Sequence, residues 1–206
     1  MVLNSQRKNV FHIEHLPLLA RLHRNCFRSG NMKSSGLQRI LTRLMFYPML
    51  KISRQPIRGK ISVNIGKEKR IAHFDARNRQ FSALYFDVFS TGYEPEFTTI
   101  IDALVPDDAV LYDIGSNWGF FAIYLASRPG FKGHVHAFEP WPKTHLDLVQ
   151  LVKELKLSNS ITCHKTALSD TSGHANMYSP SHSGLAHLSD KNHSTNIESV
   201  KLDDID

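Results

Sequence analysis

Cysteines and long apolar runs are scarce in this chain. Its 206 residues hold two cysteines, Cys26 and Cys163, which form neither a disulfide pattern nor a metal-binding pattern. Cys163 lies in an apolar run, so we expect a buried thiol. No stretch reaches the roughly 18 consecutive apolar residues of a membrane span, and the first 30 residues lack the apolar core of a signal peptide. These absences predict a soluble protein in the reducing cytoplasm.

Acidic residues are nearly missing from the first 60 residues, which hold 12 Lys and Arg but a single acid, Glu14. The net charge is therefore +11 over residues 1–60 and −5 over residues 61–206. The basic character belongs to an N-terminal arm and not to the domain behind it. We predict a partly helical basic arm at 1–60, followed at 61–92 by a β-hairpin and a helix that lead into the main domain.

Residues 37–47 carry apolar side chains at helical spacing, with arginines off that face. A helix packed on its own domain explains this pattern. One alternative is contact between residues 37–60 and an anionic membrane surface. Nucleic-acid contact is another, although no basic and aromatic pattern of a known nucleic-acid reader is present.

Short strands and helices alternate regularly from residue 109 onward. Such repeats predict an α/β fold with a parallel sheet and helices on both faces. In these sheets ligands bind beyond the carboxyl ends of the strands. We expect Leu146, Val149, Val152 and Leu155 to face inward and the strand at 109–112 to be buried. The predicted strands are 61–65, 70–74, 109–112, 134–138 and 161–164, and the predicted helices are 78–90, 94–104, 120–127 and 142–155.

The turn after the strand at 109–112 has the composition of a ligand-binding loop. Asp113 ends the strand, and Gly115 and Gly119 turn the chain into a helix. Glycine permits unusual dihedrals and has no Cβ to block a ligand, while Asn117 is a candidate to cap the helix. Asp113 could instead cap that helix or tie down the loop.

The same turn lacks two of the three glycines of the dinucleotide fingerprint. Asn117 and Phe120 stand where the second and third glycines would be, which disfavours an NAD(P)-dependent oxidoreductase. A ligand without phosphate and with an amino-acid tail tolerates Asn at this position and can still use Asp113.

Glu139 ends the next predicted strand, 26 residues after Asp113. A carboxylate there can accept hydrogen bonds from both hydroxyls of a ribose, which favours a nucleoside ligand. The alternative is a structural carboxylate at the start of the next helix.

Three motifs in this order resemble the FkbM family of S-adenosylmethionine-dependent methyltransferases. They are Asp-x-Gly-x-Asn-x-Gly at 113–119, Ala-Phe-Glu-Pro at 137–140 and Thr-Ala-Leu-Ser-Asp-Thr-Ser-Gly at 166–173, and the resemblance begins near Tyr93. It implies that residues 93–206 form the N-terminal portion of a Rossmann-like, class I methyltransferase domain. The sequence pattern of the family continues beyond the position that corresponds to residue 206, so we expect the sheet to be incomplete on its C-terminal side.

The resemblance also implies the roles of individual residues. S-adenosylmethionine is the expected cofactor, Glu139 would hold its ribose, and Ala167 and Asp170 would lie beside its adenine. The expected acceptor is a hydroxyl of a sugar or secondary metabolite. The residues implied in the cofactor loop are Asp113, Gly115, Ser116, Asn117 and Gly119.

The catalytic base stays unassigned at this stage. His182 and His187 flank residues 183–185, which resemble the family's substrate-side loop, and His187 is the stronger candidate base. Surface polar roles are the alternative for both histidines. No His, Asp and Glu cluster has metal-ligand spacing, so no metal is expected.

Three other functions remain open at the level of sequence. They are an NAD(P)-dependent oxidoreductase, an RNA methyltransferase that uses the basic arm, and a non-catalytic Rossmann-like interaction module. No pattern predicts an oligomeric state.

Overall fold

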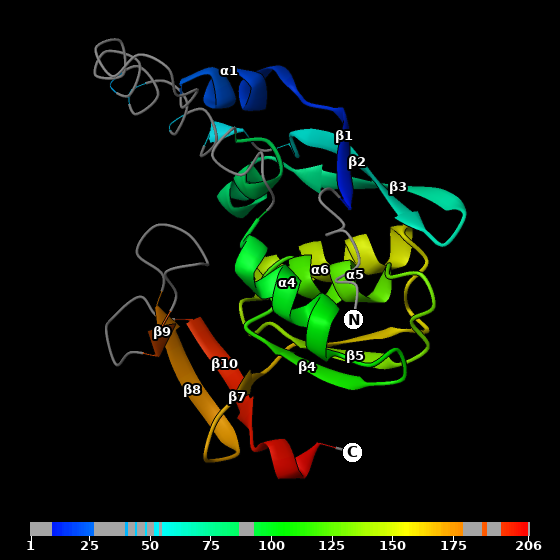
Figure 1. Cartoon of the computed structure of the whole chain (residues 1–206). Coiled ribbons are helices and arrows are strands. Elements are labelled where there is room, and N and C mark those ends of the chain that lie inside the picture. The colour runs from blue at the N-terminus through cyan, green and yellow to red at the C-terminus, as the bar shows by residue number, and fades with distance from the viewer. Residues whose placement is uncertain are drawn as a thin grey trace. The chain divides into compact units, whose positions relative to one another are not determined.

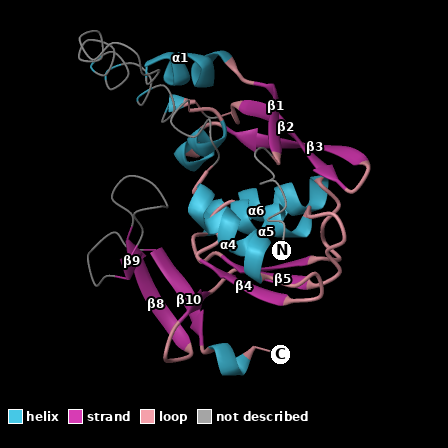
Figure 2. Ribbon diagram, viewed as in Figure 1, coloured by secondary structure: helices cyan, strands magenta, loops and turns pink. Residues whose placement is uncertain are grey.

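The structure is a computed structural model. It divides into two compact units, residues 1–103 and residues 104–206, and both mix helices with strands (Figures 1 and 2). Within the described ranges, no helix is long and apolar enough to cross a membrane. The described residues are 10–26, 40, 44, 48, 52, 53, 55–86, 93–178, 187, 188 and 195–205.

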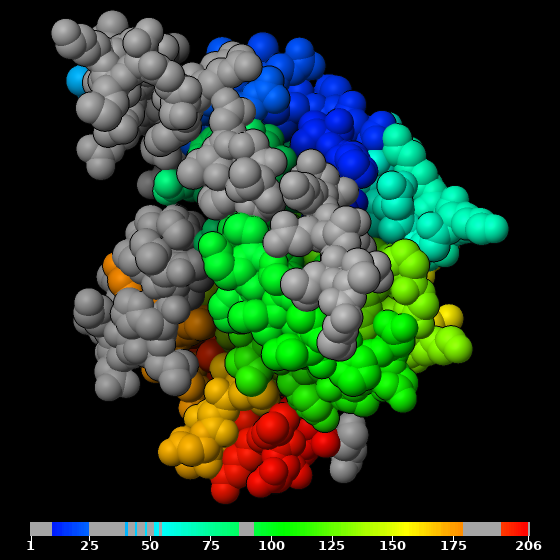
Figure 3. All heavy atoms as spheres, viewed as in Figure 1, coloured from blue at the N-terminus to red at the C-terminus, as the bar shows by residue number. Residues whose placement is uncertain are grey.

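The first unit contains a three-stranded antiparallel sheet in the order β1-β2-β3. Its strands are β1 (Phe11–His15), β2 (Arg58–Ile65) and β3 (Glu68–Asp75). The predicted hairpin, formed by β2 and β3, is confirmed, and its atoms are cyan in the space-filling view (Figure 3). β1 was not predicted, because its pairing partner lies more than forty residues further along the chain. Most of the predicted helix at 37–47 lies outside the described residues.

The helices whose bounds are described alongside this sheet are α1 (Leu18–Cys26), the 3-10 helix η2 (Arg79–Leu84) and α4 (Pro95–Leu104). The helix predicted at 94–104 is confirmed. The helix predicted at 78–90 is a 3-10 helix over its described part, and residues 87–90 lie outside the description. The buried apolar side chains of the sheet and η2 include Ile61, Val63, Ala72, Phe74 and Phe81.

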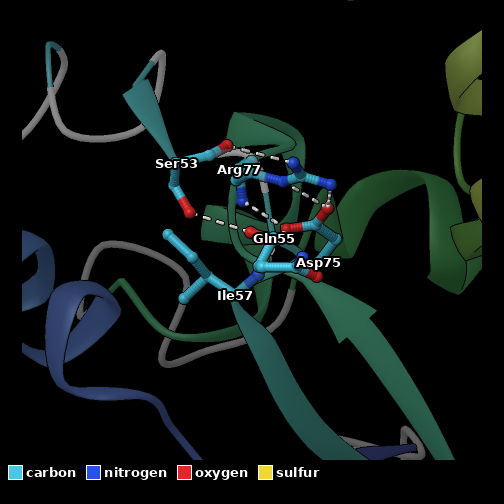
Figure 4. A network of polar contacts seen from close by, with 5 residues as sticks. All are labelled: Ser53, Gln55, Ile57, Asp75 and Arg77. Carbon is cyan, nitrogen blue, oxygen red and sulfur yellow. Dashed lines mark hydrogen bonds and ion pairs between the residues drawn. The ribbon is translucent and has the colours of Figure 1, made fainter.

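A carboxylate at the end of β3 fastens the segment that leads into β2 (Figure 4). Asp75 Oδ1 accepts hydrogen bonds from the backbone N–H of Ile57 at 3.1 Å and of Arg77 at 3.0 Å. Asp75 Oδ2 accepts from Arg77 Nε at 2.7 Å, and Arg77 Nη1 donates to the carbonyl oxygen of Ser53 at 3.3 Å. Ser53 Oγ in turn donates to the carbonyl oxygen of Gln55 at 2.8 Å. The network closes the end of the β2–β3 ladder.

The second unit contains a three-stranded parallel sheet in the order β4-β5-β6. Its strands are β4 (Val110–Ile114), β5 (His134–Phe138) and β6 (Ile161–His164), joined by α5 (Phe120–Ala126) and α6 (Pro142–Glu154). Right-handed crossovers that advance in one direction place successive helices on the same face of a sheet. α5 and α6 accordingly lie on one side of this sheet (Figure 1). The parallel sheet is confirmed.

The opposite face of the parallel sheet carries neither α5 nor α6, so the prediction of helices on both faces is wrong for the described part of this unit. The strand at 109–112 was also predicted to be buried. Instead β4 alternates, and Ile114 is 62% exposed. Val110 and Tyr112, which lie on the same face as Ile114, are exposed as well. The alternation arises because successive side chains of a strand point to opposite faces.

The inward face of α6 differs from the prediction. Val152 and Leu155 are buried as expected, but Val149 is exposed and Leu146 is 67% exposed. A spacing of three residues drifts by about 60° at each step around a helix, so a set chosen at that spacing leaves the core face. The buried side chains of α6 and its C-cap are Thr144, Leu148, Leu151, Val152 and Leu155.

A four-stranded sheet that was not predicted follows β6. Its order is β7-β10-β8-β9, in which β7 runs parallel to β10 and the other pairs are antiparallel. The strands are β7 (Ala167–Leu168), β8 (Gly173–Tyr178), β9 (His187–Leu188) and β10 (Thr195–Val200), and the 3-10 helix η5 (Leu202–Asp204) comes after them.

Candidate functional site

The loop of residues 115–119, between β4 and α5, is fastened to the end of β5. The backbone N–H groups of Gly115 and Ser116 both donate to the carbonyl oxygen of Phe138 at 2.9 Å, and Gly119 N–H donates to Ser116 O at 2.8 Å. Three loop residues have left-handed backbone angles, with φ of +74° at Gly115, +54° at Asn117 and +90° at Gly119. The loop is therefore a defined turn in which glycine is favoured at two positions.

The two loop glycines meet different surroundings. A Cβ at Gly119 would lie 2.5 Å from Leu148 Cδ1, so this glycine allows the loop to approach α6. A Cβ at Gly115 would meet nothing within 4 Å, so open space lies beside it. Ser116 between them is 6% exposed, and its Oγ has no hydrogen-bond partner. A buried hydroxyl without a partner is an unsatisfied polar group that a ligand could complete.

Asp113 caps α5. Its Oδ2 accepts a hydrogen bond at 3.2 Å from the backbone N–H of Ala122 in the first turn of α5, where N–H groups have no partner within the helix. Burial raises the pKa of Asp113 to about 6, partly opposed by this hydrogen bond. Asn117 was predicted to be the cap, but its Oδ1 accepts from Trp118 N–H at 2.9 Å, and the N-cap position is Gly119. The left-handed Asn117 lies too early to reach the first turn.

Glu139 bridges the loop and the start of α6. Its Oε2 accepts from Asn117 N–H at 2.9 Å, and its Oε1 accepts from Trp141 N–H at 2.8 Å. The side chain is 6% exposed. Burial raises the pKa of Glu139 to about 7, the two N–H groups oppose the rise, and the nearby charge of Asp113 adds to it. Two of the roughly four lone-pair positions of the carboxylate remain for a ligand.

Hydrogen bonds join Asp113 to the start of α5 and Glu139 to the loop, whereas Ala167 and Asp170 have other partners. Ala167 pairs with Ser199 between β7 and β10, and Asp170 accepts from Ser169 Oγ at 3.1 Å. Within the described ranges, no hydrogen bond joins Ala167 or Asp170 to the loop.

The candidate base His187 lies in β9, where its backbone pairs with Tyr178 in the four-stranded sheet. Its side chain lies outside the description, as do His182 and residues 183–185. Cys163 is half-buried, and burial raises the pKa of its thiol to about 11, so it is a weak nucleophile at neutral pH.

Sequence reasoning missed the backbone partners at the site: the carbonyl of Phe138, the N–H of Trp141 and the carbonyl of His164, which accepts from Glu139 N–H at 3.0 Å. Nearly every residue carries the same main-chain N–H and C=O groups, so the residue types do not reveal which of these groups are hydrogen-bonded at the site.

Among the described residues, no group of three or more His, Cys, Asp or Glu side chains could hold a metal ion. Comparison with protein-family models, with curated proteins and with solved structures finds no match to the chain. The chemistry of this site therefore has to be inferred from its own residues.

Proposed function

We propose that the second unit is a Rossmann-like, class I domain that binds S-adenosylmethionine and serves methyl transfer to a hydroxyl of a sugar or other small molecule. The observation that carries the proposal is the loop after β4, which Glu139 ties to the end of β5. Asp113, the open space beside Gly115 and the unsatisfied hydroxyl of Ser116 lie in the same turn. Ligands of parallel sheets bind at this edge.

The chemistry of these groups suits the proposed cofactor. An amino-acid tail and a ribose offer N–H and O–H donors together with a carboxylate. Asp113 Oδ1 and the remaining lone pairs of Glu139 are acceptors for such donors, and the Ser116 hydroxyl can donate or accept. The bound cofactor supplies a methyl group that is already activated. The protein then has to hold the accepting hydroxyl at attack distance.

A second candidate is a non-catalytic α/β module. It is favoured by the hydrogen bonds of the two carboxyl groups, because Asp113 caps α5 and both oxygens of Glu139 accept backbone N–H groups. For either function we propose the cytoplasm as the compartment, since Cys163 is a free thiol.

Isothermal titration of the full chain with S-adenosylhomocysteine tests the proposal. Gly115→Ala places a methyl group in the open space beside the loop, and we expect it to weaken binding by at least about tenfold, or about 1.4 kcal/mol. Gly66→Ala is the matched control, because Gly66 also has a positive φ, of +61°, and nothing within 4 Å of a Cβ, but lies in the β2–β3 turn.

A second pair of variants tests the carboxylates. Asp113→Asn keeps an oxygen that can cap α5 but removes the charge, so the fold should persist while affinity falls. Glu154→Gln alters a half-buried carboxylate at the end of α6, which accepts a hydrogen bond from Gln150, and should leave affinity unchanged. A well-folded wild-type chain that binds no S-adenosylhomocysteine would favour the non-catalytic module.

A further inference from the structure

Two imidazole rings meet on the face of the parallel sheet that carries neither α5 nor α6. His136 lies in β5 and His164 ends β6, and the distance from His136 Nδ1 to His164 Nε2 is 3.0 Å. Val135 and Ala137, the buried neighbours of His136 in β5, lie on the other face, because successive side chains of a strand alternate. Both histidines are half-buried, and neither ring has a role in the proposed methyl transfer.

Aromatic neighbours hold each imidazole in place. The His136 ring stacks on the Tyr112 ring of β4, with centroids 5.1 Å apart and an interplanar angle of 13°. The His164 ring stacks on the buried Phe138 ring of β5, with centroids 4.4 Å apart and an angle of 10°. The parallel pairing of β5 with β6 sets Phe138 opposite His164. The two nitrogens are thus positioned in advance, which lowers the entropic cost of binding a ligand between them.

The separation of the two nitrogens suits a metal ion. Imidazole nitrogens bind a divalent transition metal at about 2.0–2.1 Å. At that bond length, nitrogens 3.0 Å apart make an angle of about 95° at the metal. Tetrahedral ligands at the same bond length would be about 3.3–3.4 Å apart. An angle near 90° belongs to square-planar and octahedral ions, and square-planar nitrogen sites are typical of Cu²⁺ and Ni²⁺.

The other groups on this face limit the protein ligands to two. His134 is the nearest further imidazole, with its ring centroid 5.0 Å from that of His136, but its Nε2 lies 2.7 Å from Thr162 Oγ1. Over the described ranges, no set of three or more His, Cys, Asp or Glu side chains could hold a metal ion. A pair of imidazoles without a carboxylate favours transition metals over Mg²⁺ and Ca²⁺, which prefer oxygen ligands.

We propose that His136 Nδ1 and His164 Nε2 chelate a divalent copper or nickel ion on this face of the parallel sheet, with water at the remaining coordination positions. The hydrogen that the two nitrogens share moves through water to the other nitrogen of the ring that donated it, so both rings bind the ion in neutral form. Copper should bind more tightly than nickel, in the general order of affinities of nitrogen sites. The site does not require that the loop of residues 115–119 bind S-adenosylmethionine.

Titration of the full chain with Cu²⁺, followed by NMR, locates the ion, because its unpaired electron broadens the signals of nearby nuclei. The ring signals of His136 and His164 should broaden at the lowest Cu²⁺ concentrations, before those of His15, an exposed histidine of β1. Mg²⁺ at the same concentrations should leave all of these signals unchanged. If a folded chain shows no early broadening at His136 and His164, the proposal is wrong.

Variants assign the ligands. Isothermal titration with nickel chloride should show that His136→Gln and His164→Gln each weaken binding by about tenfold or more, because each removes one of the two protein ligands. His134→Gln is the matched control on the same strand and face, and it should change the affinity by less than about twofold. Circular dichroism verifies that the variants are folded. An equal loss of affinity for His134→Gln and His136→Gln would show that the chelating pair is not the one proposed.

Discussion

At the scale of single residues, Gly119 and Gly130 make a matched pair. Their backbone φ angles are +90° and +89°, so both positions disfavour a side chain to the same degree. A Cβ at Gly119 would also meet Leu148 Cδ1 at 2.5 Å in the core, whereas at Gly130 the nearest atom is Asp107 Oδ2 at 3.3 Å, on an exposed side chain.

Gly119→Ala should therefore lower the free energy of unfolding by about 2–5 kcal/mol, combining backbone strain with overpacking. Gly130→Ala should lower it by about 1–2 kcal/mol, through strain alone. Denaturant unfolding followed by circular dichroism measures both. Equal losses would show that Leu148 moves aside without penalty.

His23 is a buried histidine whose ionisation opposes folding. It is 3% exposed, its Nδ1 lies 3.3 Å from the Tyr85 hydroxyl, and burial, aided by the charge of Arg79, lowers its pKa to about 4. The unfolded chain binds this proton from about pH 6.5 downward, but the folded chain binds it only near pH 4. Stability is thus lost as the pH falls through this window, by about 3 kcal/mol in total.

Replacing His23 by Phe should remove this part of the pH dependence, as measured by denaturant unfolding at several pH values between about 4 and 7. His15→Gln changes an exposed histidine of β1 and is the control. If His23→Phe and wild type lose stability in parallel over the same range, another group carries the effect.

At the scale of elements, α6 has one buried face and one exposed face, and two of its leucines lie on opposite faces. Leu148 is fully buried while Leu146, two residues earlier and on the opposite side of the helix, is 67% exposed. Leu148→Ala should lower the free energy of unfolding by about 3 kcal/mol. Leu146→Ala should change it by less than about 0.5 kcal/mol.

Thermal or denaturant unfolding of the two alanine variants separates these outcomes. A larger loss for Leu146→Ala would mean that the face predicted from sequence, and not the face in the structure, lies against the sheet.

The elements also divide into those that could and could not be predicted. Strands β5 and β6 were predicted with their observed bounds, because each is a short segment in which polar and apolar residues alternate. β1 and the sheet of β7 to β10 were missed, since their strands are stabilised by partners distant in the chain.

At the scale of the whole molecule, charge divides between the two units. Residues 1–103 hold 17 Lys and Arg against 7 Asp and Glu, a net charge of +10, while residues 104–206 carry a net −4. The net positive charge of residues 1–103 attracts polyanions, and salt screens this attraction.

We therefore expect binding to heparin that weakens steeply with added salt. Replacing Arg58 and Lys67, both exposed in the first unit, by Gln should weaken binding severalfold. Replacing Lys132 and Lys153, both exposed in the second unit, by Gln should weaken heparin binding less. Fluorescence-detected titration with heparin at several salt concentrations measures the affinity of each double variant. Equal losses of affinity for the two variants would show that heparin does not prefer the positively charged first unit.

The sequence by itself determined the alternation of strands and helices from residue 109 to residue 164, the position of the glycine turn and the uneven charge. Each of these depends on residue type and local spacing. It also singled out Asp113 and Glu139, because a carboxylate at the end of a strand is visible in the order of residues.

Only the tertiary structure decided which face of the sheet lies under helices, how β1 joins the hairpin and what Glu139 binds. These features join segments that are distant in the chain, and the partners of Glu139 are backbone N–H groups that every residue except proline carries. The positions of these groups in space, which residue types do not encode locally, allow Glu139 to connect the loop to the start of α6.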